Sequence, residues 1–430
     1  MSLQPVRIGL LGFGTVGGSL VGLINEQRTD IAALTGLDLV VTRVAVKDLS
    51  KPRLGLGEAV LSDDVNDVLN TDDVDLVVEL VGAVDLAREW ISSALRSGKS
   101  VVTGNKALLA AHGRELFDLA ADNGVELLFE ASVAGAIPLM RTLQKSLRGE
   151  PIDRIMGIVN GTTNYMLSAM TEDGADYAEI LAEAQRLGYA EADPTADVEG
   201  HDAQAKAAII ATVAFGVAVT SADVPVEGIS GVTGADIANA SRLGYVIKLL
   251  AVVERVGDTA PYEISARVHP TMVPLSHPLA TVRGSFNAIF VEGGAVDELM
   301  LYGRGAGGRP TASAVLGDVI EAASGIAHGS VRQLPPLGEA RIRPAEAATS
   351  AFYLDLAVDD RPGVLAEVAG VFGANGVSIK SMEQEGLGAE ATLAFITHQA
   401  SEADMAATLE KLTSLPSVNR VGALYRVIGE

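Results

Sequence analysis

The sequence predicts an α/β fold that begins with a doubly wound parallel sheet, continues with an α+β domain and ends with a small domain of ferredoxin-like order. Short apolar runs alternate with helical patterns between Val6 and Phe129, as strands and crossover helices do in such a sheet. Beyond Ala131 this alternation ends, and strand-like runs are interleaved with helices in a different order. Residues 350–430 then follow the order strand, helix, strand, strand, helix, strand.

The strands of the first sheet are predicted from runs rich in Val, Ile and Leu, which suit strands buried on both faces. The second sheet is predicted to be mixed or antiparallel, with helices between its strands. The predicted strands cover residues 6–11, 39–46, 76–81, 100–103 and 125–129 in the first sheet and 155–159, 247–253, 262–268 and 280–290 in the second, with helices over 162–171, 177–187, 202–219 and 234–244.

The composition excludes several classes of function. The 430 residues include 55 acidic against 32 basic side chains, and a net charge of −23 argues against nucleic acid or an anionic membrane as a partner. The chain has no cysteine, which excludes disulfides, thiolate metal sites and a cysteine nucleophile. No signal peptide is evident between Met1 and Arg7, so we expect a cytoplasmic protein.

A glycine-rich loop directly follows the first predicted strand and opens a helix. Glycines at this spacing allow a tight turn, close approach of the backbone to a pyrophosphate, and close packing of the helix on the strand. The helix N-terminus adds free N–H groups and a partial positive charge. The context therefore indicates a Rossmann-type dinucleotide site rather than a turn without a ligand. Its residues are Gly12, Phe13, Gly14, Thr15, Val16 and Gly17.

The end of the second predicted strand bears on which dinucleotide binds. An acidic residue there favours the free ribose of NAD. Asp48 lies at this position, so NAD remains an alternative cofactor. Lys47 and Arg53 could contact the 2′-phosphate of NADP, so we favour NADP. The alternative for all three residues is a solvated loop.

An acidic run from Gly188 leads into a helix that carries Asp202 and Lys206. These two residues are four apart, so they share one helix face. The helix is apolar all round and is therefore predicted to be buried. A lysine held beside a carboxylate can act as general acid and base at a substrate hydroxyl, and the alternative is a structural ion pair. A second lysine, Lys106, follows the fourth predicted strand, at the edge where this fold places its ligands.

These residues resemble the homoserine dehydrogenase family. The resemblance covers residues 5–325 in the family's order, and the C-terminal part looks like an ACT domain. The matching motifs are Gly-Phe-Gly-Thr-Val-Gly (12–17), Thr-Gly-Asn-Lys-Ala (103–107), Glu-Ala-Ser-Val-Ala-Gly-Ala-Ile-Pro (130–138), Gly-Ile-Val-Asn-Gly-Thr-Thr-Asn-Tyr (157–165), Gly-Tyr-Ala-Glu-Ala-Asp-Pro (188–194), Asp-Val-Glu-Gly-His-Asp-Ala-Gln-Ala-Lys (197–206), Gly-Arg-Gly-Ala-Gly (303–307), Asp-Asp-Arg-Pro-Gly-Val-Leu (359–365) and Asn-Gly-Val-Ser-Ile (375–379).

The resemblance implies reversible, NAD(P)-linked interconversion of L-homoserine and L-aspartate 4-semialdehyde in threonine and methionine biosynthesis. It implies that Lys206 transfers the proton, that Glu191 and Asp202 bind substrate, and that Lys106 lies beside substrate and nicotinamide. Whether Lys206 or Lys106 is the proton donor stays open. Gly188 and Gly303 would also hold cofactor, and a monovalent cation, Na⁺ or K⁺, would fall on Glu130, Val133, Gly135 and Ile137.

The expected domains are a dinucleotide-binding domain over residues 1–135, on which residues 303–325 pack back, and a substrate, catalytic and dimerisation domain over 136–302. A linker over 331–349 leads to the ACT domain over 350–430. ACT domains commonly pair across subunits, so we expect a homodimer or homotetramer with an amino-acid effector, threonine above all. The expected effector-binding residues are Asp360, Arg361, Pro362, Gly363, Asn375, Val377 and Ile379.

Rival functions differ from this one in a testable way. A semialdehyde dehydrogenase that forms an acyl-enzyme needs a cysteine, which this chain lacks. A dehydrogenase of another amino acid would share the glycine loop but not the pattern over residues 188–206. A regulatory protein that senses nucleotide and amino acid would bind cofactor without turnover.

Overall fold

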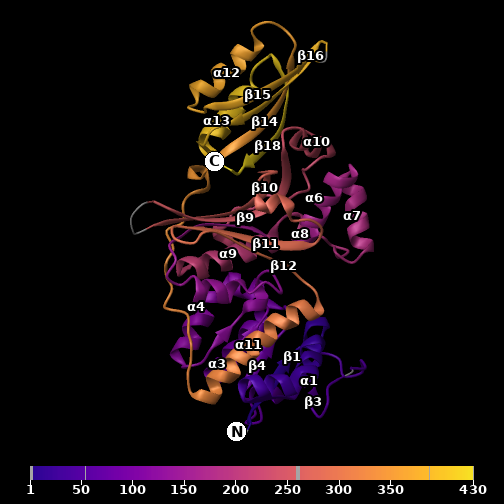
Figure 1. The fold of residues 1–430 in the computed structure, drawn as a ribbon, viewed down its shortest axis with the longest axis vertical. Coiled ribbons are helices and arrows are strands. Elements are labelled where there is room, and N and C mark those ends of the chain that lie inside the picture. Colours follow the sequence, from indigo (N-terminus) through magenta and orange to yellow (C-terminus); the bar gives the residue numbers. More distant parts are fainter. Residues whose placement is uncertain (1–2, 54, 258–261, 387, 430) are drawn as a thin grey trace. The chain divides into compact units, whose positions relative to one another are not determined.

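The computed structural model describes residues 3–53, 55–257, 262–386 and 388–429. The chain forms two compact units, each assembled from segments far apart in the sequence (Figure 1). In these described ranges, no helix is long and apolar enough to cross a membrane. Unit 1 comprises Met1–Gly161, Asp202–Val224 and Phe286–Ala340, and unit 2 comprises Thr162–His201, Pro225–Ser285 and Arg341–Glu430.

Unit 1 contains a six-stranded sheet in the order β3-β2-β1-β4-β5-β6, whose paired strands all run parallel. This is the strand order of a doubly wound dinucleotide-binding fold. Because β1 pairs with both β2 and β4, the direction of the winding reverses there, and the carboxyl ends of β1 and β4 flank the usual ligand position. The strands are β1 (Gln4–Leu11), β2 (Leu37–Ala45), β3 (Val60–Ser62), β4 (Leu76–Glu79), β5 (Ser100–Thr103) and β6 (Leu127–Leu128).

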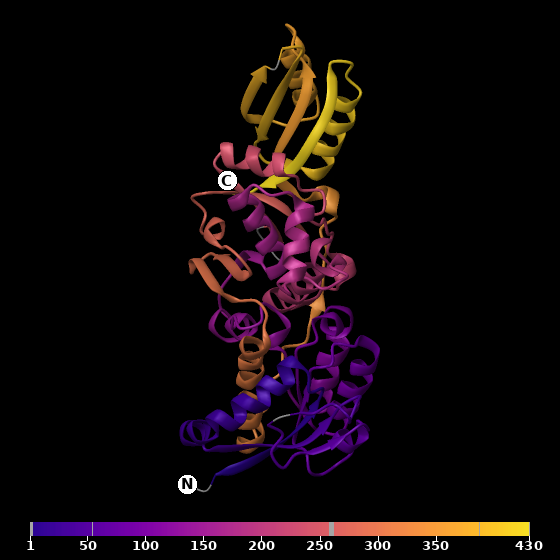
Figure 2. The same ribbon diagram turned by 90° about the vertical axis from the view of Figure 1, so that its right-hand side faces the viewer.

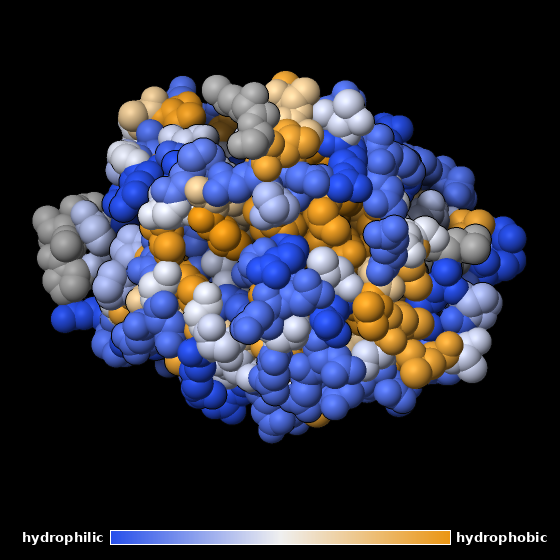
Figure 3. All heavy atoms as spheres, turned by 90° about the horizontal axis from the view of Figure 1, so that it is seen from below, coloured by the Kyte–Doolittle hydropathy of each residue, from blue (hydrophilic) through white to orange (hydrophobic). Residues whose placement is uncertain are grey.

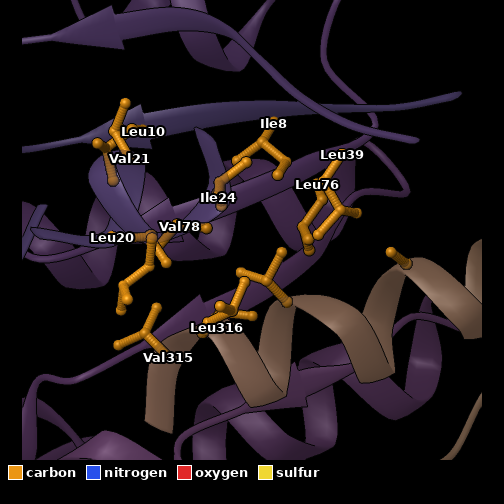
Figure 4. Close-up of a cluster of buried hydrophobic side chains, with 14 of the residues drawn as sticks. Ile8, Leu10, Leu20, Val21, Ile24, Leu39, Leu76, Val78, Val315 and Leu316 are labelled. Atoms are coloured by element: carbon orange, nitrogen blue, oxygen red, sulfur yellow. The ribbon is translucent and has the colours of Figure 1, made fainter. Parts of the chain in front are cut away.

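One face of this sheet is covered by two helices from opposite ends of unit 1, α1 (Thr15–Thr35) and α11 (Gly308–His328), which lie side by side (Figure 2). Leu20 and Ile24 of α1 and Val315 of α11 point into one cluster with strand residues of the sheet (Figure 4). Burying each such side chain contributes about 1.5–3 kcal/mol. The other helices between the strands are α2 (Asn66–Leu69), α3 (Val84–Arg96) and α4 (Lys106–Asp122).

The rest of unit 1 is built on three antiparallel strands, β7 (Ile152–Ile158), β11 (Phe286–Gly293) and β12 (Asp297–Arg304). The predicted strand over residues 280–290 is wrong in its first half, because Pro278–Thr281 forms a 3₁₀ turn with proline at its start. The strand β12 was not predicted. The remaining elements are α5 (Leu139–Arg141), α9 (His201–Phe215), β8 (Val217–Ala218) and β13 (Gly338–Glu339).

Unit 2 contains a long antiparallel hairpin, β9 (Tyr245–Val256) with β10 (Glu263–Pro274), and a C-terminal domain with the sheet order β18-β14-β16-β15. This order confirms the ferredoxin-like prediction. Phe352, Phe372 and Phe395 lie in the domain's core. The elements of the domain are β14 (Thr349–Asp359), α12 (Val364–Ala374), β15 (Ile379–Gly386), β16 (Glu390–Thr397), β17 (Ala400–Ser401), α13 (Glu402–Thr413) and β18 (Val418–Val427); the other helices of unit 2 are α6 (Gly161–Asp173, whose first residue belongs to unit 1), α7 (Tyr177–Arg186), α8 (Thr195–Val198) and α10 (Gly234–Arg242).

The C-terminal domain is joined to the hairpin by backbone pairing, since β18 runs parallel to β10 with Thr271 opposite Arg426. The amide of Ile428 adds a hydrogen bond to the carbonyl of Met272 at 3.1 Å. The segment before β14 is also docked, because Ile264 exchanges backbone hydrogen bonds with residues 341 and 343. Within unit 2 the C-terminal domain is therefore part of a continuous sheet and is not joined to the hairpin by a linker alone.

The view in Figure 3 shows the distribution of hydrophilic and hydrophobic residues on one face. Figure 3 shows one face on which hydrophilic residues predominate, with smaller hydrophobic patches scattered among them. Such a surface is ordinary for a soluble domain, because apolar atoms contribute much of any folded surface.

Candidate active site

A buried carboxylate in unit 1 binds two lysines from two different helices. Asp202, in the first turn of α9, accepts a hydrogen bond from Lys206 Nζ at 2.6 Å, as the i, i+4 spacing predicts. Its other oxygen accepts one from Lys106 Nζ, at the start of α4. Asn160 Nδ2 donates to Asp202 at 2.9 Å, and Lys206 also donates to the carbonyl of Val159 at 2.7 Å.

The two lysines of this cluster keep the carboxyl group of Asp202 ionised. Burial by itself would raise the pKa of Asp202, but Lys206 and Lys106 beside it hold that pKa well below its usual range. The side chain of Lys206 is only 10% exposed, whereas that of Lys106 is 44% exposed. Lys106 therefore presents more of its side chain to solvent or a ligand than Lys206 does.

Local structure places each member of the cluster. Lys106 opens α4 directly after β5, at the carboxyl edge of the parallel sheet. Asn105 caps that helix by accepting from the amide of Leu108 at 3.1 Å. Asn160 follows the carboxyl end of β7. Asn160 was not among the predicted site residues, although it is a polar residue directly after a strand and within a matched motif.

The glycine loop has the conformation that its spacing predicts. Gly12 has a φ of +99°, which side chains rarely adopt, and a Cβ on Gly17 would lie 2.4 Å from the carbonyl oxygen of Gly12. Gly14 is the N-cap of α1 without a side-chain cap, and a Cβ there would meet nothing within 4 Å. The N-terminus of α1 therefore presents backbone N–H groups to open space, which fits a pyrophosphate.

The residues proposed to select the dinucleotide lie in the loop after β2. Lys47 is exposed, and Arg53 donates to the carbonyls of Asp48 at 2.7 Å and Lys51 at 2.9 Å. The Asp48 carboxylate accepts from the backbone and hydroxyl of Ser50, which lowers its pKa. Asp48 is thus engaged in its own turn, and Lys47 remains accessible at this edge.

The predicted cation residues form a tight loop against the end of β12. Ala134 and Gly135 both have positive φ, at 55° and 53°, and a Cβ on Gly135 would lie 2.4 Å from the carbonyl oxygen of Gly305. A Cβ on Gly303 would lie 3.1 Å from Ile137, so the structure brings the predicted cofactor residue Gly303 to this loop. Buried Val133 completes the loop.

The carboxylate of Glu130 stabilises the chain beyond this loop, since its oxygens accept from the amides of Met140 at 2.8 Å and Arg141 at 2.9 Å. Burial raises the pKa of Glu130. Burial also raises the pKa of Asp318 to about 7, although the positive charge of Arg141, which donates a hydrogen bond to Asp318, acts to lower that pKa. Among the described residues no group of three or more His, Cys, Asp or Glu could hold a metal. A cation here would therefore depend mainly on backbone carbonyls.

Two of the predicted substrate- and cofactor-binding residues belong to unit 2. Gly188 follows α7 with a φ of +77°, and Glu191 is exposed three residues later. Gln185 donates to the carbonyl of Glu191 at 3.1 Å, and Thr162 donates to that of Tyr189 at 2.7 Å. The segment is thus fastened to α6 and α7, while the carboxylate of Glu191 faces solvent.

The predicted effector residues separate into two groups. Asp360, Arg361, Pro362 and Gly363 line a cavity of about 340 Å³ before α12. Asn375 instead caps the end of α12 and accepts from Lys411 at 2.6 Å, Val377 is buried in the core, and Ile379 packs against that core. Within one chain, these last three residues do not line the cavity.

The fold and this geometry define the class of protein: a dinucleotide-binding protein of the Rossmann type, with a lysine–carboxylate cluster at the carboxyl edge of its sheet and a ferredoxin-like domain at its C-terminus. Family models agree with this class. Residues 12–130 match the NAD-binding domain of homoserine dehydrogenase, residues 138–320 match homoserine dehydrogenase itself, and residues 352–417 match the ACT domain.

Relatives match over the whole chain. Homoserine dehydrogenase of Corynebacterium glutamicum is 50% identical, covering 99% of this chain and 96% of its own length, and that of Bacillus subtilis is 41% identical with 99% of each covered. The crystal structure of a homoserine dehydrogenase from Thiobacillus denitrificans superposes with a TM-score of 0.94, at 38% identity and 99% coverage of both chains. The chain belongs to the homoserine dehydrogenase family.

A solved relative bears on the cofactor. A hyperthermophilic archaeal homoserine dehydrogenase in complex with NADPH is 29% identical, with a TM-score of 0.64, and covers 77% of this chain and 100% of its own. In this chain the family-model match over residues 12–130 shows a dinucleotide-binding domain, as the sequence predicted.

The burial of Asp202 predicts a specific loss of stability in acid. Because its folded-state pKa is depressed, its contribution is present above its unfolded-state value of about 3.9 and is lost as the pH falls through the folded-state value. Asp202→Asn should destabilise unit 1 by about 3–5 kcal/mol at neutral pH, since Lys206 is then buried without a counter-charge. The difference should shrink below about pH 4. Urea denaturation followed by the fluorescence of Trp90, the single tryptophan, measures it.

Glu183→Gln, which breaks the exposed pair with Arg186, is the matched control and should change stability much less. Equal acid profiles for the wild type and Asp202→Asn would contradict the assignment of a buried, ionised Asp202.

Proposed function

We propose that this chain catalyses the reversible, NAD(P)-linked interconversion of L-homoserine and L-aspartate 4-semialdehyde. The observation that carries the proposal is the cluster in which Lys106 and Lys206 share the buried carboxylate of Asp202, in a chain of this family. Its position beside the carboxyl edge of the sheet is where such a fold brings ligands together.

We assign the role of each residue from the family resemblance together with its surroundings. The cofactor, when bound, supplies or accepts the hydride, and the protein supplies orientation and the proton. Lys206 would donate a proton to the substrate oxygen in reduction and accept it in oxidation. Asp202 positions both lysines, while the more exposed Lys106 contacts substrate, and Glu191 offers a carboxylate for the substrate ammonium.

For the cofactor we propose NADP over NAD. The support is the exposed Lys47 after β2 and the engagement of Asp48 with Ser50, which leaves that carboxylate less able to hold a free ribose. The open N-terminus of α1 at Gly14 is the place for the pyrophosphate. We also propose a cytoplasmic location, in keeping with a chain that has no cysteine.

The test of the activity is the oxidation of NADPH and of NADH with L-aspartate 4-semialdehyde, followed at the nicotinamide absorbance. Turnover with NADPH at the higher kcat/KM is expected. A protein that binds dinucleotide without turnover would be a sensor. Turnover only with another amino-acid semialdehyde would make it a different dehydrogenase.

The two lysines can be separated by kinetics. Lys206→Met keeps the bulk of the side chain and removes the proton, so kcat should fall by about 10²-fold or more in both directions while cofactor affinity changes little. Lys106→Met should raise KM more than it lowers kcat, because a binding group stabilises ground state and transition state alike. If folded Lys206→Met turns over near the wild-type rate and Lys106→Met is inactive, Lys106 is the proton donor.

We propose a Na⁺ or K⁺ site at the carbonyls of the loop over residues 133–137, because carbonyl oxygens suit a hard cation. The rate should fall when both ions are replaced by choline at constant ionic strength and should recover saturably on their return. Gly135→Ala, whose Cβ meets the carbonyl oxygen of Gly305, should raise the concentration needed. Gly149→Ala, in open space, is the control. A rate independent of both ions would refute the site.

We propose further that the C-terminal domain binds an amino-acid effector, L-threonine above all, and that the chain forms at least a dimer. Removing the domain would be a poor test, because it would strip β18 from β10. Asp360→Ala, at the cavity before α12, should instead raise the half-inhibitory threonine concentration about tenfold without changing the uninhibited rate. Glu410→Ala, on the exposed face of α13, should leave inhibition unchanged. Equal inhibition of all three proteins would place the sensor elsewhere.

A further inference from the structure

Glu79, the last residue of β4, is a fully buried acidic residue that the proposed mechanism does not use. One of its carboxyl oxygens accepts hydrogen bonds from the backbone amides of Val81 at 2.6 Å and Gly82 at 3.3 Å. The other oxygen accepts from the hydroxyl of Thr103 at 2.6 Å. Burying an acidic group is costly, and an apolar side chain of similar volume could fill the same space. What the carboxyl group adds at this position is therefore its acceptors.

These acceptors connect the ends of two neighbouring strands. β4 and β5 run parallel with Glu79 opposite Thr103, so the two side chains lie on one face of the sheet at its carboxyl edge. The Thr103 hydroxyl accepts in turn from the amide of Asn105 at 3.0 Å. Asn105 caps α4, and its Nδ2 donates at 2.9 Å to the carbonyl of Ala83, in the loop after β4. The loops after β4 and β5 are thus bound to each other through the side chains of Glu79 and Asn105.

This series of hydrogen bonds ends directly before Lys106. Lys106 is the first residue of α4, and its amide donates to the carbonyl of Gly104 at 3.1 Å. Because the cap at Asn105 fixes where the helix begins, it also fixes the point from which the Lys106 side chain extends to Asp202. A change in the loop after β5 would therefore move the ammonium group of Lys106.

The loop after β4 also lies against the glycine loop. A Cβ on Gly12 would lie 3.0 Å from the carbonyl oxygen of Leu80 and 3.1 Å from the side chain of Val81. In a doubly wound fold one nucleotide of the cofactor lies toward β2, so the other lies on the opposite side of the glycine loop, toward β4 and β5. The loops that Glu79 connects are therefore the ones expected beside the nicotinamide half of the cofactor.

We propose that Glu79 is a positioning residue that acts through Lys106 and the loop after β4. Its hydrogen bonds hold both in the arrangement that binds substrate and nicotinamide. Glu79 itself would contact neither ligand, since its side chain is fully buried. The part of the proposal that concerns substrate rests on the proposed function, whereas the part that concerns the dinucleotide can be tested without turnover.

A pair of variants at Glu79 tests the acceptors. Glu79→Met removes them and keeps the length of the side chain. Glu79→Gln keeps one oxygen for the two backbone amides and places an NH2 group that can donate to Thr103. NADPH is titrated into the full chain and its fluorescence followed. We expect Glu79→Met to weaken NADPH binding about tenfold and Glu79→Gln to weaken it much less. Equal NADPH affinities of the wild type and folded Glu79→Met would overturn the proposal.

A pair of variants at Thr103 interrupts the series at one point and is measured whether or not Glu79→Met folds. Thr103→Val replaces the hydroxyl by a methyl group, and Thr103→Ser keeps the hydroxyl. Thr103→Val should raise the KM for L-aspartate 4-semialdehyde about tenfold and lower kcat less, because Lys106 acts as a binding group. Thr103→Ser should stay close to the wild type. Thr42→Val is the control, because the Thr42 hydroxyl donates at 2.7 Å to the carbonyl of Asp73, ahead of β4.

A double-mutant cycle separates positioning from a general loss of stability. If Thr103 acts through Lys106, Thr103→Val should raise KM much less in a Lys106→Met background than in the wild type, because the group that it positions is already absent. Additive effects of the two substitutions on KM would overturn the proposal, and so would equal KM values for Thr103→Val and Thr103→Ser. If the wild type does not turn over L-aspartate 4-semialdehyde, the proposed function fails by itself, and the NADPH titrations still decide whether Glu79 holds the loop after β4.

Discussion

A carboxylate buried between two lysines is the constraint on which the site in unit 1 depends. An isolated charge cannot remain ionised in an apolar interior, so Asp202 requires donors on each of its oxygens. These donors come from α4, from α9 itself and from the turn after β7. The pairing thus fixes the start of two helices against the end of a strand, and the arrangement that satisfies the charge also aligns the lysines for chemistry.

Close backbone contacts hold the surroundings of this cluster. The loop at Gly135 touches the backbone at Gly305, and Gly308, at the start of α11, lies against Thr15 at the start of α1. Cβ atoms at these glycines would collide with backbone or side chains of the facing segment. The segment between β12 and α11 therefore packs at once on the predicted cation loop and on the helix that follows the glycine loop, so it links the proposed sites within unit 1.

The segment that leads to the ACT domain, which includes residues 338–343, is held in place by hydrogen bonds to other strands. In unit 1 it forms β13, which pairs with β8 directly after α9, and Glu339 of β13 makes an ion pair with Arg114 of α4. In unit 2 its continuation is held by the backbone of Ile264, and β18 extends the hairpin through β10. Both helices that carry the lysines thus contact this segment or its partner strand within unit 1.

The sequence by itself determined most of the order of the elements, although not β12, because apolar periodicity and glycine spacing are local signals. It determined the glycine loop and the pairing of Asp202 with Lys206, which are separated by a single helical turn. Tertiary structure alone decided that Lys106, nearly a hundred positions earlier, binds the same carboxylate, and that Asn160 joins it. It also decided that β18 completes the sheet beside β10. Contacts of this kind depend on how strands order themselves in a sheet, and no local pattern of residues encodes that choice.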